Sequence, residues 1–132
     1  LLLRYLKKIF YNSVAELRMK MYTSIVDAVK KAANLVGIKK IIPSGTAIQN
    51  ARTSFIGDHM NRDGYHLDLT IGRYTAACTW FEALTHRNVT ENPYSPEGMD
   101  PIHKKAAQMA AHNAILYPDK VTELTELKKI AD

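Results

Sequence analysis

The chain has 132 residues, of which 46% are hydrophobic and 23% charged, and its formal net charge is +5. This length suits one domain, and no apolar run approaches the roughly 18 residues that a membrane span needs. The basic residues are spread as lysine pairs, from Lys7-Lys8 to Lys128-Lys129, a pattern typical of solvated helix faces, so we expect neither a nucleic-acid nor a membrane partner.

Apolar residues at steps of three and four predict a long amphipathic helix over residues 14–35. Ser13 and Glu16 form a capping-box pattern at its start, and Gly37 suits the position after its last turn. Both boundaries agree with the periodicity.

Residues 38–42 predict a short strand, because β-branched isoleucines flank two lysines and Pro43 follows. A helix followed by a short strand is typical of an α/β fold. One strand cannot make a sheet, so it either pairs with residues outside this chain or the domain is a helical bundle. The chain opens with Leu1 rather than Met, and we expect it to be cut from a longer protein.

Four further segments have helical signals. Thr46 and Gln49 suggest a capped short helix up to about residue 54, a polar loop runs from Gly57 to Gly64, and a helix over 70–84 should place Trp80 in the core. After a proline-rich loop, Asp100-Pro101 should start a helix that runs to Tyr117, with His103 and His112 exposed on opposite faces. A last helix should bury Leu124, Leu127 and Ile130.

The loop after the short helix holds Asp63 and His66, three residues apart with Gly64 between them. The Asp63 carboxylate can then reach Nδ1 of His66, which sets the tautomer and leaves Nε2 as a base. Spacing alone also fits a simple turn in which Asp63 caps the loop and His66 is merely exposed.

The flanking sequence resembles the C-terminal part of an SGNH (GDSL-like) hydrolase, and more narrowly an uncharacterised bacterial branch of that family. The matching segments are Ile41–Arg52 (IIPSGTAIQNAR), Asp63–Leu67 (DGYHL) and Gly72–Tyr74 (GRY). The resemblance covers roughly residues 13–84. It implies a flavodoxin-like three-layer sandwich, with residues 1–84 its C-terminal part and 85–132 a helical extension. It also implies that His66 is the general base of a Ser-His-Asp triad and Asp63 its orienting partner.

The family's nucleophile block of the Gly-Asp-Ser type and its oxyanion blocks are absent here, and Ser44 is a poor substitute for the missing serine. The resemblance therefore implies that this chain carries part of an esterase, inactive alone, whose partner is the missing N-terminal part of the same domain. The substrate would be a small ester, most plausibly an acylated carbohydrate, with Tyr65 as a stacking surface. The intact protein would be periplasmic or secreted if its N-terminus carries a signal peptide.

We expect no cofactor and no metal, because Asp58, His59, Asp63 and His66 match no zinc or calcium spacing. Cys78 is the sole cysteine, so no internal disulfide is expected. The alternative to a hydrolase is a non-catalytic helical interaction module whose basic surface binds an acidic partner.

Overall fold

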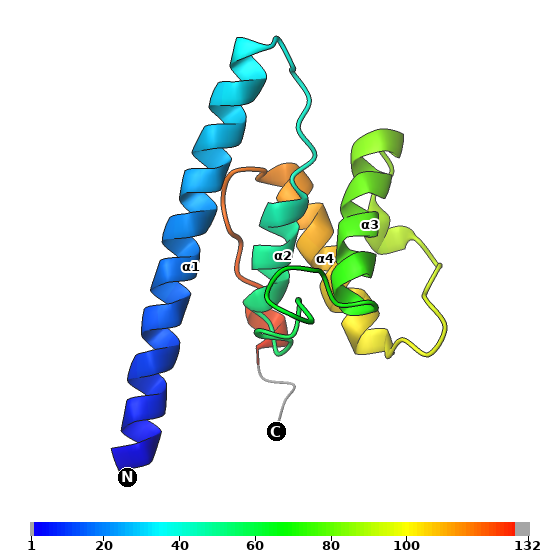
Figure 1. Cartoon of the computed structure of the whole chain (residues 1–132). Coiled ribbons are helices and arrows are strands. Elements are labelled where there is room, and N and C mark those ends of the chain that lie inside the picture. The colour runs from blue at the N-terminus through cyan, green and yellow to red at the C-terminus, as the bar shows by residue number, and fades with distance from the viewer. Residues whose placement is uncertain (1, 129–132) are drawn as a thin grey trace. The chain divides into compact units, whose positions relative to one another are not determined.

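The computed structural model describes residues 2–128, and helices are the regular elements throughout that range (Figure 1). The predicted α/β fold, part of a flavodoxin-like sandwich with a strand over residues 38–42, is wrong for this chain. Helices make up 63% of it, and residues 2–128 contain no strand. Residues 38–43 follow an irregular path because no neighbouring strand in the described range offers them a hydrogen-bonded ladder.

The chain divides after Ile41 into two compact units. The first is essentially one helix, α1 (Leu2–Leu35). It starts a full eleven residues before the predicted capping box, so Ser13 lies inside it and donates from Oγ to the carbonyl of Ile9 at 3.0 Å. The predicted end is confirmed, since Gly37 has φ +73° and the next amide, Ile38 N–H, donates to Ala33 O.

The second unit packs three helices together: α2 (Ser44–Arg52), α3 (Ile71–Thr85) and α4 (Pro101–Leu116). Two short 3₁₀ turns, η1 (Val89–Glu91) and η2 (Thr125–Leu127), complete it. The inner face of α4 consists of fully buried alanines, which let α2 and α3 approach its backbone closely; they are Ala106, Ala107, Ala110, Ala111 and Ala114. The sequence led us to expect a domain boundary after Leu84. The second unit continues across that position, because α4 packs on α2 and α3.

The starts of α3 and α4 agree with prediction. Asp100 caps α4, accepting at Oδ1 from Ile102 N–H at 2.9 Å, with Pro101 in the first turn. The capping box predicted for α2 is wrong, because α2 begins at Ser44 and Thr46 donates instead to Pro118 O at 2.6 Å. Trp80 is also not a core residue, since it is 53% exposed.

Within the described residues, the predicted last helix is reduced to the single turn η2 (Thr125–Leu127). Its segment is instead bonded to the end of α2: Asn50 accepts from Thr122 N–H, and Thr53 Oγ1 accepts from Leu124 N–H. These bonds tie the irregular residues 122–124 to the end of α2. Leu124 and Leu127 are nevertheless buried as predicted, while Ile130 lies outside the described residues.

Candidate active site

The polar loop between α2 and α3 is closed at its base by backbone pairing. Asn61 and Leu67 form an antiparallel bridge, and Arg62 N–H donates to His66 O at 3.1 Å. Below them, Asp68 N–H donates to Met60 O at 2.9 Å. Residues 60–68 therefore form a small closed turn, the DGYH loop, which carries the predicted catalytic residues.

Three anchors attach the DGYH loop to the helices. Met60 is fully buried in the core. The Arg52 side chain at the end of α2 donates to Asn61 Oδ1. Asp68 Oδ2 accepts from the amide and hydroxyl of Thr70 at the start of α3. The loop is thus exposed at its tip and held at its base.

At the tip, Asp63 and His66 are paired as the sequence predicted. The distance from Asp63 Oδ2 to Nδ1 of His66 is 2.7 Å. The other oxygen, Oδ1, accepts from the amides of His66 at 2.7 Å and Tyr65 at 3.0 Å. Gly64, at φ +79°, supplies the left-handed residue that lets the chain fold back this tightly. One carboxylate therefore both shapes the turn and orients the imidazole, so the turn and dyad interpretations of Asp63 are compatible.

The hydrogen bonds to Asp63 lower its pKa to about 2, chiefly through the backbone amide of His66, then the His66 ring, then the amide of Tyr65. A carboxylate that is ionised at neutral pH can only accept, so Nδ1 of His66 must be the donor. In the neutral ring the lone pair is then on Nε2, to which no described residue bonds. The His66 side chain is 65% exposed, so Nε2 is accessible from solvent.

Acidification should therefore loosen the loop. Because the folded-state pKa of Asp63 lies below the ordinary value of 3.8, its ordering effect is present above that value and lost as pH falls through about 2. In an NMR titration we expect the Tyr65 and His66 amide shifts to move together with a midpoint near 2. Asp63→Asn should abolish this transition, and a midpoint near 4 would contradict the three-bond geometry.

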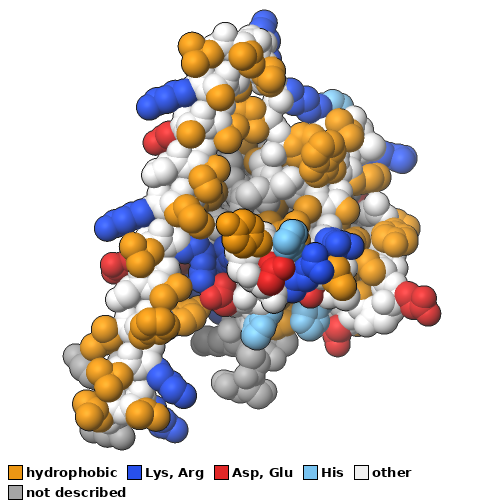
Figure 2. Space-filling view, viewed as in Figure 1, with side chains coloured by type: hydrophobic (Ala, Val, Ile, Leu, Met, Phe, Trp, Pro, Cys, Tyr) orange, Lys and Arg blue, Asp and Glu red, His pale blue; other side chains and the backbone are white. Residues whose placement is uncertain are grey.

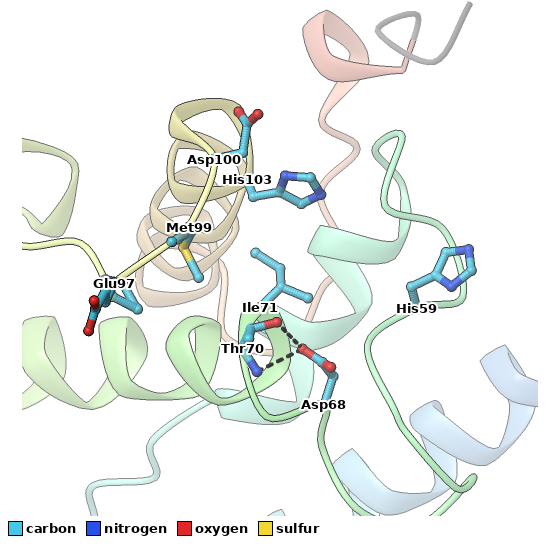
Figure 3. A pocket seen from close by; sticks show the side chains of 10 residues that line it. His59, Asp68, Thr70, Ile71, Glu97, Met99, Asp100 and His103 are labelled. Carbon is cyan, nitrogen blue, oxygen red and sulfur yellow. Dashed lines mark hydrogen bonds between the residues drawn. The ribbon is translucent and has the colours of Figure 1, made fainter.

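A separate pocket of about 360 Å³ lies between the start of α3 and the start of α4 (Figure 3). Its lining includes Asp68 and Asp100, the two carboxylates that cap these helices, together with His59 and His103. Asp63, Tyr65 and His66 do not line it. Within residues 2–128, no group of three or more His, Cys, Asp or Glu side chains is placed to hold a metal ion.

A second histidine–carboxylate pair was not predicted. Nδ1 of His112 on α4 lies 2.8 Å from Glu82 Oε1 on α3, and Glu82 Oε2 accepts from Val89 N–H at 3.0 Å. The expectation that His112 is exposed is wrong, since its side chain is 27% exposed, and that of Glu82 is 8% exposed. The pair is thirty residues apart in sequence, and spacing on α4 alone could not reveal it. The Glu82–His112 pair links α3, η1 and α4 and stabilises their packing.

Comparison with known proteins gives one close structural match. A crystal structure of a DUF4886 family protein from Bacteroides uniformis is 99% identical over the matched region, with a TM-score of 0.82. The match covers 83% of this chain but 42% of that chain, so the matched part is less than half of the solved protein, here called the longer protein. No curated protein matches the chain. The model of the family described as "Domain of unknown function (DUF4886)" matches residues 6–114, and the chain belongs to that family.

Proposed function

We propose that Asp63 and His66 are the orienting acid and general base of a serine-type ester hydrolase whose nucleophile lies elsewhere in the longer protein. The observation that carries this proposal is the 2.7 Å contact between an ionised carboxylate and Nδ1 of His66, whose side chain is 65% exposed. The similarity of residues 41–52 and 63–67 to SGNH hydrolases supports the same roles.

In the proposed reaction, Nε2 of His66 accepts the serine hydroxyl proton as the serine oxygen bonds to the ester carbonyl carbon. The resulting imidazolium, stabilised by Asp63, then gives that proton to the departing alkoxide as the carbon–oxygen bond breaks. Water repeats the sequence on the acyl-enzyme: its proton passes to Nε2 and then to the serine oxygen, and a carboxylic acid is released. Asp63 remains ionised throughout.

The serines of this chain are poor nucleophiles for His66. Ser13 and Ser24 in α1 donate to carbonyls four residues earlier, and Ser54 is buried and donates to Ala51 O. Ser95 donates to the neighbouring Pro96 O, and the Ser44 hydroxyl is buried. None of them bonds His66, so the nucleophile and the oxyanion donors are assigned to the remainder of the longer protein.

Tyr65 is proposed as a substrate contact, because it is 90% exposed and its ring centre lies 6.3 Å from that of His66. An aromatic face beside the base suits the apolar face of a sugar ring. In the longer protein, Tyr65→Ala should raise KM for an acetylated sugar about five- to tenfold, equivalent to about 1 kcal/mol of stacking, with little change in kcat. Tyr65→Phe should leave KM within about twofold, and equal effects of the two variants would argue against stacking.

The nucleophile can be found by treating the longer protein with a fluorophosphonate, which bonds irreversibly to activated serines, and mapping the adduct by mass spectrometry. We expect one modified serine, outside the region that corresponds to this chain. The isolated 132-residue chain should not react. If the longer protein is unmodified, the hydrolase proposal fails and a helical interaction module with a basic surface becomes the better account.

A further inference from the structure

Arg52, the last residue of α2, is a largely buried cation at the base of the DGYH loop. Its side chain is 15% exposed. The guanidinium donates from Nη2 to Asn61 Oδ1, and its Nε lies 3.7 Å from Asp58 Oδ1. Figure 2 shows acidic, basic and histidine side chains gathered in this part of the second unit. Because a charge with so little contact with water is stable only when paired, these partners fix the position of the Arg52 side chain.

Asn61 connects this fixed side chain to the backbone of His66. Its Oδ1 accepts from Arg52, and its Nδ2 donates to His66 O over a long 3.5 Å. A guanidinium can only donate and a carbonyl oxygen can only accept, so these two neighbours allow one orientation of the Asn61 amide. The Asn61 backbone also pairs with Leu67, the residue that follows His66. Asn61 therefore links the end of α2 to the His66–Leu67 peptide.

The position of His66 in the second unit depends on such a link. The 2.7 Å contact with Asp63 orients the imidazole, but both residues belong to the tip of the same loop. That contact therefore sets the ring relative to the loop and not relative to the helices. Of the three anchors of the DGYH loop, the one through Asn61 is the one that ends on the His66 backbone. A general base must lie within hydrogen-bond reach of its nucleophile, so the place of the whole loop matters to the reaction.

We propose that Arg52 is a positioning residue of the active site: through Asn61 it holds the backbone of His66 in place and so sets where Nε2 points. Arg52 takes part in neither proton transfer. The inference rests on the proposed hydrolase function, because the position of Nε2 affects activity only if His66 is the base.

The test is a double-mutant cycle in the longer protein, with Arg52→Ala, Asn61→Ala and the variant that carries both. Each single variant should lower kcat for p-nitrophenyl acetate about 10²-fold, the effect expected when a base is displaced by about 1 Å, with KM changed by less than about twofold. The double variant should be no worse than either single variant, because both changes break the same connection. Two independent losses would instead multiply to about 10⁴-fold. Arg87→Ala, which removes an exposed arginine just after α3, is the control and should keep full activity.

Hydrogen exchange gives a second measurement that does not depend on hydrolysis. The Arg62 amide donates to His66 O, the same oxygen that Asn61 contacts. Its exchange, followed by NMR in the longer protein, should be at least about tenfold faster in Arg52→Ala and in Asn61→Ala than in the unchanged protein. Arg87→Ala should leave it unchanged.

The inference and the hydrolase proposal fail in different ways. Full activity of Arg52→Ala, with His66→Asn inactive, would overturn the inference and leave the hydrolase proposal standing. So would unchanged exchange of the Arg62 amide, or a double variant that loses about 10⁴-fold. If Arg52→Ala does not fold, Asn61→Ala decides alone, and a normal kcat in that variant overturns the inference. If His66→Asn hydrolyses the ester as fast as the unchanged protein, the hydrolase proposal fails and the inference fails with it.

Discussion

Replacing His66 by Asn in the longer protein is expected to lower kcat for hydrolysis of an activated ester by about 10⁴- to 10⁶-fold, the range seen when single residues of a serine-protease triad are removed. The Asn amide has no basic nitrogen in place of Nε2, so in the proposed mechanism both bond-forming steps lose their base. KM should change little, because the loss is in the transition state. The measurement is steady-state hydrolysis of p-nitrophenyl acetate, with folding checked by circular dichroism.

His86→Asn is the matched control. His86 is an exposed histidine at the end of α3 with φ +58°, a conformation that Asn tolerates, so this variant should keep full activity. Asp63→Asn should also lower kcat, by about 10⁴-fold, because an amide in place of the carboxylate no longer holds the required tautomer. If His66→Asn and His86→Asn retain equal activity, His66 is not the base.

Gly72→Ala should reduce the free energy of unfolding by about 2 kcal/mol or more, even though alanine favours helices. A Cβ at Gly72 would lie 2.5 Å from the Met60 carbonyl oxygen, and backbone there cannot move aside as a flexible side chain would. The same carbonyl accepts from Asp68 N–H at the base of the DGYH loop. The variant should therefore also weaken the Asp63–His66 pairing. Urea unfolding followed by circular dichroism measures the first effect.

Gly45→Ala is its control, because Gly45 occupies the same second position of α2 and a Cβ there would meet nothing within 4 Å. This change should be neutral or stabilising by up to about 1 kcal/mol. Equal stabilities of the two variants would show that the approach of α3 to Met60 is looser than described.

The parts of the fold predicted correctly are those governed by local signals. The Asp100-Pro101 start of α4 and the Gly37 end of α1 each follow from the backbone chemistry of one or two residues. The errors arose where distant partners contribute: the Thr46 hydroxyl donates to Pro118 O, 72 residues away in sequence. Similarly, Asn50 and Thr53 accept from the amides of Thr122 and Leu124 and tie that segment to α2. Strand formation over 38–42 also depends on a partner strand, and residues 2–128 contain none.

The candidate site was more predictable than the fold, because Asp63 and His66 are close in sequence and Gly64 allows the turn between them. The Glu82–His112 pair was missed for the opposite reason, since it forms only when α3 and α4 pack.

The most direct test of the proposed active site is one distance in a crystal structure of the longer protein. It joins Nε2 of the histidine that corresponds to His66 to the nearest serine hydroxyl oxygen outside the region that corresponds to this chain. The proposal predicts a serine Oγ within about 2.6–3.2 Å, or slightly farther without substrate. If no serine oxygen lies near Nε2, or if packed side chains cover it, the Asp63–His66 pair serves only to shape its loop.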